Sequence, residues 1–230
     1  MTSRATSPIA AIAFDLDGTL VDSAGGIAHA LNSALAQAGL QHFDLKTVRR
    51  WIGDGPDALI ARALAANPPD TGDVPALAAR LRRGFDAATL AAPMTGSAVF
   101  AGVAHVVEAL ALRHPLVVVT NKPTPLARAV LDHAGLLAFF GAVHGADTAP
   151  QRKPAPLLIE QAAARLGIAA GAMLMVGDAE VDIAAARAAG SAIAWAGWGY
   201  GRAPPRSRAP IWRLSAPQEL LARFAAPHGH

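Results

Sequence analysis

Four short segments of the chain are continuously hydrophobic, and each has about the length of a β-strand. They cover residues 9–14, 116–119, 172–176 and 192–195. None of them alternates polar with apolar residues, and continuous hydrophobicity is typical of parallel strands that are covered on both faces. The pattern therefore predicts a buried parallel sheet.

Segments with helical spacing separate these predicted strands. One apolar face repeats at i, i+3, i+4 and i+7 through Val103, Val106, Val107 and Leu110. Two more helical patterns span about 125–133 and 156–166. They stop near Gly135 and at Gly167, and glycine is a common C-terminal stop of a helix. Strands that alternate with helices predict an α/β fold with a doubly wound, mostly parallel sheet.

Residues 23–92 interrupt this order because they contain no strand-like run. Two sets of apolar residues there repeat every four positions: Ile27, Leu31 and Leu35, and then Leu77, Leu81 and Phe85. We predict that 23–92 is an α-helical cap domain inserted after the first strand, and that 1–22 and 93–230 together form the α/β core domain.

The C-terminal part is expected to close the core domain. Residues 202–210 are rich in proline and arginine and are predicted to form an irregular surface loop. A last short strand over 211–214 and a helix over 218–224 are expected to follow.

The charge of the chain argues against a nucleic acid partner. The 230 residues carry a formal net charge of +3, and no run of basic residues is longer than two. A nucleic-acid-binding face would need clustered basic residues interleaved with aromatic ones. A mild positive balance instead suits a small anionic substrate.

The residues that the chain lacks exclude further classes. There are no cysteines, which excludes disulfides, thiolate metal sites and cysteine nucleophiles. The N-terminal MTSRATSP has no signal-peptide core, and no apolar run reaches the ~18 residues of a membrane span. We therefore expect a cytoplasmic protein without a membrane partner, and the sequence leaves open whether it is a monomer or a homodimer.

Polar side chains follow three of the predicted strands at the point where each strand ends. Asp15 follows the first strand, Thr120 and Asn121 follow the second, and Asp178 comes just after the third. In an open parallel sheet, ligands bind beyond the carboxyl ends of the strands. Lys153 precedes a predicted helix and is expected at the same edge, so the sequence predicts a binding site there.

Carboxylates that converge at one place need a cation to compensate their repulsion. Asp15 and Asp17 are two residues apart, and in extended chain such side chains point to the same side. Together with Asp178 they form an all-oxygen set that suits a hard cation, of which Mg²⁺ is favoured.

The remaining polar residues suit a phosphate group. Thr120, Asn121 and Lys153 offer hydrogen-bond donors and a positive charge, which are the partners of a phosphate. Asp182 lies one helical turn after Asp178 and is expected on the same helical face. An acid near the N-terminus of a helix is also favoured by the helix dipole alone, which is the alternative for Asp182.

Four motifs in this order resemble those of the haloacid dehalogenase superfamily. They are DxDGT at 15–19, the hydrophobic strand that ends in Thr120 and Asn121, the pair Lys153 and Pro154, and GDxxxD at 177–182. The segments FDLDGTLVDS, RRWIGDG, VVVTNKPTP and GWGYG further resemble the bacterial phosphoglycolate phosphatase family. One short motif carries little weight, whereas four in order at strand ends are specific. The resemblance covers almost the whole chain and implies a Rossmann-like core with a helical cap.

The resemblance also implies an activity. The protein would be a Mg²⁺-dependent phosphatase of small phosphate monoesters, with 2-phosphoglycolate favoured. Asp15 would be the nucleophile that forms an aspartyl-phosphate, and Asp17 would be the general acid and base. The side chain of Asp15, the backbone carbonyl of Asp17 and Asp178 would bind the metal.

In the same resemblance, Thr120, Asn121 and Lys153 would hold the phosphoryl oxygens, and Asp182 would orient Lys153 or the metal shell. The chain departs from the family pattern at Ala179, where a small hydroxyl residue is expected. This change is expected to loosen a hydrogen bond around the site without removing the chemistry.

Specificity is expected to come from the cap. The loop that contains Gly53 is a candidate substrate contact. Arg49, Arg50 and Arg62 are candidates to bind a substrate carboxylate, because a guanidinium group matches its geometry. A solvated helix face is the alternative for these three arginines.

Other functions compete with this interpretation. A sugar-phosphate phosphatase or a phosphomutase would use the same fold, whereas a dehalogenase would not need Asp17. A non-enzymatic phospho-aspartate receiver also combines an acidic cluster with a Thr and a Lys, but its phosphorylated aspartate typically ends the third strand and no cap follows the first. The intact acidic residues argue against a catalytically inactive binding scaffold.

Overall fold

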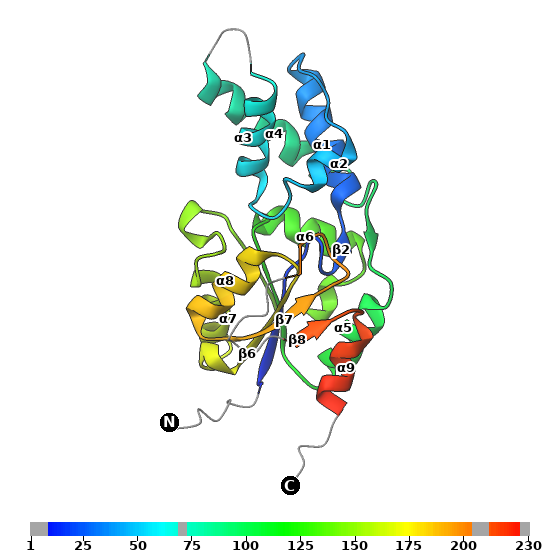
Figure 1. Ribbon diagram of the computed structural model, residues 1–230, viewed down its shortest axis with the longest axis vertical. Coiled ribbons are helices and arrows are strands. Elements are labelled where there is room, and N and C mark those ends of the chain that lie inside the picture. Colours follow the sequence, from blue (N-terminus) through cyan, green and yellow to red (C-terminus); the bar gives the residue numbers. More distant parts are fainter. Residues whose placement is uncertain (1–8, 69–72, 204–211, 226–230) are drawn as a thin grey trace.

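The computed structural model describes residues 9–68, 73–203 and 212–225 (Figure 1). At its centre is a six-stranded sheet with the order β5-β4-β1-β6-β7-β8, in which all neighbouring strands are parallel. The strands are β1 (Ala11–Phe14), β4 (Leu116–Thr120), β5 (Ala142–Gly145), β6 (Met173–Gly177), β7 (Ala192–Ala196) and β8 (Trp212–Leu214).

Helices cover both faces of this sheet. On one face lie α5 (Val103–Ala111), α6 (Thr124–His133) and α9 (Gln218–Ala225), and on the other lie α7 (Leu157–Arg165) and α8 (Glu180–Ala189). Successive residues of a strand point to opposite faces. Ile12 and Phe14 accordingly pack in the hydrophobic cluster of the first face, and Ala13 packs in that of the second. The predicted doubly wound parallel sheet is confirmed.

The four hydrophobic runs and the last short strand all form strands of this sheet, although residue 211 and most of the predicted loop 202–210 lie outside the described residues. Strand β5 was not predicted. It contains His144, and of its four residues only Gly145 is fully buried, so it lacks the continuous hydrophobic run of the inner strands. The described part of the core also contains three short 3₁₀ helices: η1 (Leu137–Phe139), η2 (Ala149–Gln151) and η3 (Ala170–Ala172).

Four further helices form a separate layer beyond the carboxyl edge of the sheet (Figure 1). They are α1 (Ala24–Gln37), α2 (Leu45–Arg49), α3 (Pro56–Ala66) and α4 (Val74–Ala91). The apolar repeats expected from the sequence pack in their common core, with Leu31, Leu35 and Leu81 almost completely buried. The helical cap is therefore present, and its division from the core at residues 22/23 and 92/93 stays a prediction.

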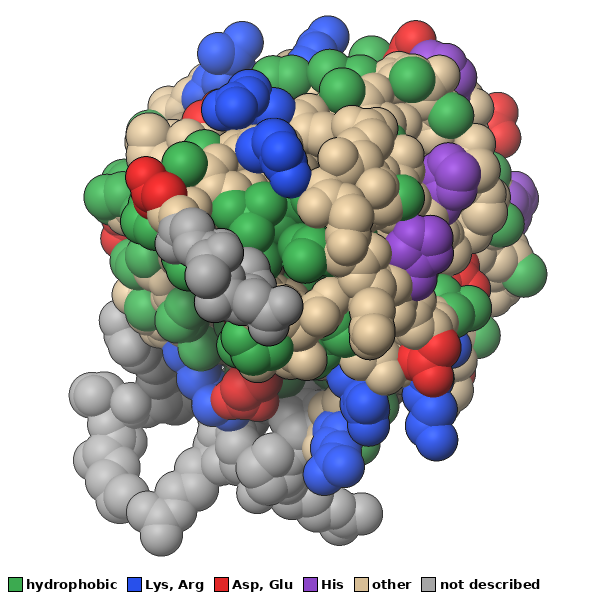
Figure 2. All heavy atoms as spheres, turned by 90° about the horizontal axis from the view of Figure 1, so that it is seen from above, with side chains coloured by type: hydrophobic (Ala, Val, Ile, Leu, Met, Phe, Trp, Pro, Cys, Tyr) green, Lys and Arg blue, Asp and Glu red, His purple; other side chains and the backbone are tan. Residues whose placement is uncertain are grey.

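The surface of the cap end carries basic side chains in separate groups, with apolar and other residues between them (Figure 2). This arrangement differs from the continuous basic face that nucleic acid binding favours. None of the helices within the described ranges combines the length and the apolar character that crossing a membrane requires.

Two chain segments connect the sheet to the cap, and they touch each other closely. Strands β2 (Val21–Asp22) and β3 (Ala98–Val99) pair in antiparallel fashion there. A Cβ atom on Gly25 would lie only 2.1 Å from the carbonyl oxygen of Gly96. Because that oxygen belongs to the backbone, a larger residue at position 25 would have to push the two segments apart.

The variant Gly25→Ala is therefore expected to be less stable than the wild type. Overpacking costs about 1–3 kcal/mol, and a chain of this size loses roughly 2–4 °C in Tm per kcal/mol. Thermal unfolding followed by circular dichroism measures this. Gly171→Ala is the matched control, because its added Cβ would meet only the Gly190 carbonyl at 3.5 Å. Equal Tm values for the two variants would contradict the close contact.

Candidate active site

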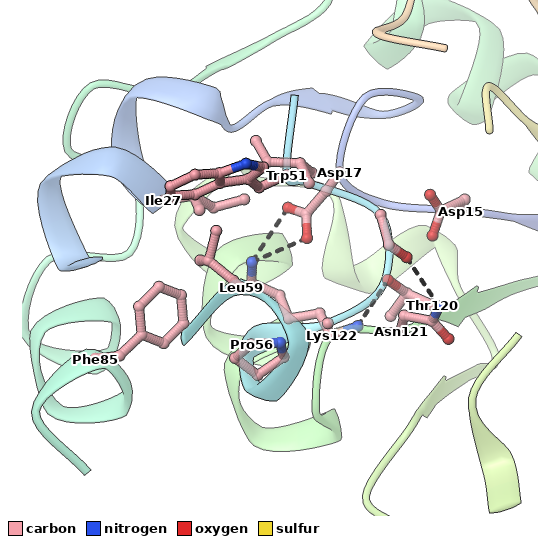
Figure 3. Close-up of a pocket in the computed structure, with 13 residues that line it drawn as sticks. Asp15, Asp17, Ile27, Trp51, Pro56, Leu59, Phe85, Thr120, Asn121 and Lys122 are labelled. Atoms are coloured by element: carbon pink, nitrogen blue, oxygen red, sulfur yellow. Dashed lines mark hydrogen bonds and ion pairs between the residues drawn. The ribbon is translucent and has the colours of Figure 1, made fainter. Parts of the chain in front are cut away.

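A cleft of about 450 Å³ lies between the strand ends and the cap and opens to solvent (Figure 3). Its polar side comes from the core and consists of Asp15, Asp17, Thr120, Asn121 and Lys122. Its other side comes from the cap and is mostly apolar, with Ile27, Trp51, Ile52, Pro56, Leu59 and Phe85. Of the residues predicted at the strand ends, Asp15, Thr120 and Asn121 therefore line this cleft, whereas Asp178 and Lys153 are not part of its lining.

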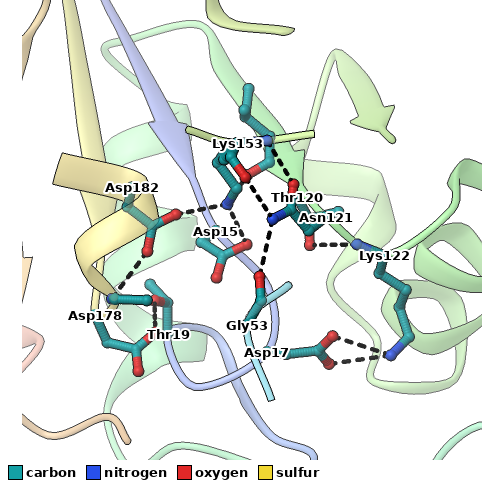
Figure 4. Close-up of polar contacts among 12 residues, drawn as sticks. Asp15, Asp17, Thr19, Gly53, Thr120, Asn121, Lys122, Lys153, Asp178 and Asp182 are labelled. Atoms are coloured by element: carbon teal, nitrogen blue, oxygen red, sulfur yellow. Dashed lines mark hydrogen bonds and ion pairs between the residues drawn. The ribbon is translucent and has the colours of Figure 1, made fainter. Parts of the chain in front are cut away.

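The ammonium group of Lys153 contacts both Asp182 and Asp15 (Figure 4). Its Nζ donates hydrogen bonds to Asp182 Oδ1 at 2.6 Å, to Asp15 Oδ1 at 2.8 Å and to the Val119 carbonyl at 2.9 Å. Burial alone would lower the pKa of Lys153, but the two carboxylates outweigh burial and raise this pKa above its ordinary value. The lysine therefore stays charged.

The surroundings of Asp15 disfavour the charged form of its carboxyl group. Burial is the largest influence and raises the pKa of Asp15, and the neighbouring carboxylates of Asp182 and Asp17 raise it further against the opposing effect of Lys153. The pKa of Asp182 is also raised by burial, again against Lys153. Lys153 thus only partly offsets the cost of burying charge on these two carboxylates.

Asp178 is held by the turn after β7. Its Oδ2 accepts hydrogen bonds from the backbone N–H groups of Tyr200 at 2.7 Å and Gly201 at 3.1 Å, and its Oδ1 accepts one from Thr19 Oγ1 at 3.1 Å. Burial raises the pKa of Asp178 to about 6, and the charge of Asp15 adds to this effect. The turn approaches so closely that a Cβ on Gly199 would lie 2.4 Å from Asp178 Cβ.

Three carboxylates come close together at this edge. One oxygen each from Asp15, Asp178 and Asp182 lies within 4.8 Å of the other two. An all-oxygen set of this size fits a divalent hard cation. Asp182 already uses Oδ1 for Lys153 and Oδ2 for the N–H of Ala179. Asp178 accepts three hydrogen bonds, and a carboxylate offers about four lone pairs. Each of the three side chains therefore keeps a lone pair for a metal, and the choice of Asp15 and Asp178 stays a prediction.

Asp17 is turned toward another partner. Its carboxylate lies outside this acidic group and binds Lys122 Nζ through both oxygens, at 3.1 and 3.0 Å (Figure 4). Strand β1 ends at Phe14, so the alternation of extended chain no longer governs position 17. Both Asp15 and Asp17 line the cleft, and a metal bond from Asp17 through its backbone carbonyl stays a prediction.

Thr120 and Asn121 follow β4 directly. The Thr120 hydroxyl oxygen accepts a hydrogen bond from the N–H of Lys122 at 3.2 Å, which leaves its own O–H to donate. The Asn121 amide is occupied: it accepts from the N–H of Lys153 at 2.7 Å and donates to the carbonyls of Lys153 and Gly53 at 3.1 and 2.9 Å. Asn121 thus fixes the backbone of Lys153 and contacts the cap loop, and a contact with phosphate stays a prediction.

The three cap arginines do not belong to the residues that line the cleft. Arg62 forms an ion pair with Asp54 and donates to the Trp51 carbonyl at 2.7 Å. Arg50 donates to Thr47 Oγ1 at 3.2 Å on the exposed surface. Arg49 lies over the ring of Tyr200, with 4.6 Å between its Cζ and the ring centroid. Their predicted contact with a substrate gains no support from these positions.

Sequence reasoning missed two parts of the site. Lys122 was given no role, although it directly follows the two predicted phosphate-binding residues and is one of only three lysines in the chain. The role of Tyr200 and Gly201 was also missed, because it is carried by backbone N–H groups, which leave no side-chain signature.

Comparison with known proteins agrees with this geometry. A family model described as haloacid dehalogenase-like hydrolase matches residues 9–190. The phosphoglycolate phosphatase of Rhodospirillum rubrum is 42% identical over 201 residues, which cover 86% of this chain and 83% of that protein. The crystal structure of a predicted phosphoglycolate phosphatase from Haemophilus somnus has a TM-score of 0.83 at 30% identity and covers 93% of this chain and 97% of its own.

The protein CbbY from Rhodobacter sphaeroides is a further structural neighbour. Its structure in complex with phosphate has a TM-score of 0.78 at 25% identity and covers 92% of this chain and 96% of its own. A mutant of CbbY was solved in complex with xylulose-(1,5)bisphosphate.

The N-terminus of α8 gives a testable consequence. Ala179 is the N-cap residue, has extended backbone angles and makes no side-chain cap. In Ala179→Ser the hydroxyl would accept a hydrogen bond from a free N–H of the first turn, which is worth about 1 kcal/mol. We expect Tm to rise by roughly 2–4 °C in a thermal melt. Ala188→Ser is the control, because it adds the same hydroxyl at an exposed position of α8 away from its N-terminus. An equal Tm for wild type and Ala179→Ser would contradict the assignment.

Proposed function

Because this chain is a phosphoric monoester hydrolase of the haloacid dehalogenase-like family, we propose that it hydrolyses 2-phosphoglycolate to glycolate and phosphate. The reaction passes through an aspartyl-phosphate on Asp15, with Mg²⁺ as the cofactor. The observation that carries the proposal is the buried Asp15, which lines the cleft while Lys153 binds its Oδ1 at 2.8 Å. The similarity to phosphoglycolate phosphatases supports the choice of substrate.

In the first step Asp15 attacks the phosphorus atom. A bond forms between a carboxylate oxygen and phosphorus while the bond to the leaving alcohol oxygen breaks. Asp17 gives its proton to that oxygen, so that the leaving oxygen of glycolate departs as a neutral hydroxyl group.

In the second step water attacks the same phosphorus atom. Asp17, which has lost its proton, accepts one from the water, and the bond between phosphorus and Asp15 breaks. Phosphate is released, and both carboxyl groups return to their starting states.

The phosphoryl group needs positive partners during both steps. Lys153 provides a fixed charge, and Asp182 keeps this lysine charged and in place through the 2.6 Å contact. The hydroxyl group of Thr120 donates to a phosphoryl oxygen. Because these groups are held before the substrate arrives, little reorganisation is needed as charge develops.

Asp15, Asp178 and the backbone carbonyl of Asp17 would hold Mg²⁺. When bound there, the ion supplies positive charge that offsets the repulsion between the anionic nucleophile and the phosphate and stabilises the charge that develops in the reaction. The oxygen-only donor set supports a hard cation, and the choice of Mg²⁺ over other hard cations is part of the proposal.

Release of inorganic phosphate from a panel of phosphate esters tests this proposal. We expect 2-phosphoglycolate to have the highest kcat/KM by at least about tenfold, a difference that pocket contacts commonly supply. Removal of Mg²⁺ with EDTA abolishes turnover, and added Mg²⁺ restores it. Asp15→Asn, which removes the nucleophile, lowers kcat by at least about 10⁴-fold.

Asp132→Asn is the matched control, because Asp132 is exposed on α6 and should retain activity. If a sugar phosphate or bisphosphate is the best substrate with the same dependence on Asp15, the mechanism stands and 2-phosphoglycolate is wrong. If the folded wild type turns over no ester, a phosphomutase or a phospho-aspartate receiver replaces the phosphatase proposal.

A further inference from the structure

Lys122 is the one cation among the described residues that line the cleft. Its side chain is 5% exposed, and the side chain of its partner Asp17 is 14% exposed. The apolar cap residues Ile27, Trp51 and Leu59 lie around this pair (Figure 3). Apolar surroundings lower the local dielectric and strengthen the interaction of a charge with its partner.

The hydrogen bonding of Lys122 is incomplete. An ammonium group has three N–H donors, and Asp17 is the only partner of Lys122 Nζ in the described part of the chain. Lys153, in contrast, uses its ammonium group for three different acceptors. Lys122, which lines the cleft, therefore has one donor left, whereas Lys153 has none.

The position of Lys122 corresponds to the organic end of a substrate. Asp17 gives its proton to the leaving oxygen in the proposed mechanism, so the leaving group must come next to Asp17. A carboxylate that is one carbon away from the leaving oxygen then comes within reach of the lysine that binds Asp17 at 3.0 Å.

We propose that Lys122 reads an anionic group on the leaving-group side of the substrate, and that this contact draws Lys122 away from Asp17. The inference rests on the proposed function and assigns a residue that determines its substrate specificity. An incoming carboxylate competes with Asp17 for the same ammonium group, and the freed Asp17 turns to the leaving oxygen. An ester without such an anion leaves Asp17 bound to Lys122, so it reacts more slowly after binding.

The cap arginines are less suited than Lys122 to bind the substrate anion. Arg49, Arg50 and Arg62 lie outside the lining of the cleft, and Arg62 is already paired with Asp54. Lys122 belongs to the core domain and follows Thr120 at the end of β4. Its contact with the substrate anion would therefore not depend on the position of the cap.

The test compares kcat and KM for two pairs of esters that differ in the anion at the organic end. One pair is 2-phosphoglycolate and 2-hydroxyethyl phosphate, and the other is 3-phosphoglycerate and glycerol 3-phosphate. The measured quantity is the preference, which is the ratio of kcat/KM for the anionic ester to that for its neutral partner. We expect Lys122→Met to reduce the preference by about tenfold to hundredfold, as for loss of a charge-assisted hydrogen bond.

Two further variants separate this role from a structural one. Lys122→Arg keeps the charge and is expected to retain most of the preference, with the loss mainly in KM. Lys46→Met is the matched control because Lys46 is exposed on α2, and it leaves the preference unchanged. If Lys122→Met does not fold, Lys122→Gln replaces it under the same criterion.

A preference within threefold of the wild-type value in the folded Lys122 variant overturns the inference, and so does a wild type that prefers the anionic ester in neither pair. If the wild type prefers the anionic ester only in the second pair, 2-phosphoglycolate is wrong as the substrate. The effect of Lys122→Met on that second pair then supports or overturns the role of Lys122.

Discussion

The ammonium group of Lys153 lies buried between the carboxylates of Asp15 and Asp182, and the arrangement of the site depends on this contact. Two carboxylates at one sheet edge repel each other and lose their hydration when they are buried. One lysine between them offsets part of both effects, although the pKa values of Asp15 and Asp182 stay raised. Removal of one partner from such a buried ion pair typically costs about 3–5 kcal/mol, because the other charge is left uncompensated. Asn121 fixes the backbone of the same lysine from both sides.

A third carboxylate exceeds what Lys153 can compensate. Asp178 is held by the N–H groups of Tyr200 and Gly201, which orient it without adding a full positive charge. The remaining negative charge is the physical reason to expect a cation at this edge. We therefore expect the site to combine one fixed lysine with one bound cation.

Tyr200 connects this acidic edge to the cap. Its hydroxyl donates to Asp22 Oδ1 at 2.6 Å and accepts from the N–H of Ala24 at 3.0 Å, where the chain enters the cap. Arg49 from the cap lies over the same ring. The turn that positions Asp178 and the segment that carries the cap therefore share one side chain.

Much of this arrangement was predictable from the sequence because it follows from backbone rules. The inner strands are recognisable in the sequence as continuous apolar runs. The carboxyl ends of parallel strands lie at the same edge of the sheet, which places Asp15, Thr120 and Asp178 together. Strand β5 escaped prediction because an edge strand needs no continuous apolar run.

The direction of individual side chains was less predictable. Asp17 follows the end of its strand and turns to Lys122, and the amide of Asn121 is used for backbone contacts. Both outcomes depend on tertiary neighbours from other elements, which local sequence patterns do not encode.

Thermal unfolding during a Mg²⁺ titration tests the central claim most directly, because it reports metal binding without any substrate. A ligand that binds only the folded state adds about 2.7 kcal/mol at a hundredfold excess over Kd, which corresponds to a rise in Tm of roughly 5–10 °C. We predict this rise for the wild type, with NaCl of equal ionic strength as the control, and its loss in Asp178→Asn. A wild type whose Tm does not respond to Mg²⁺, or a variant that responds equally, would contradict a cation site at Asp15 and Asp178.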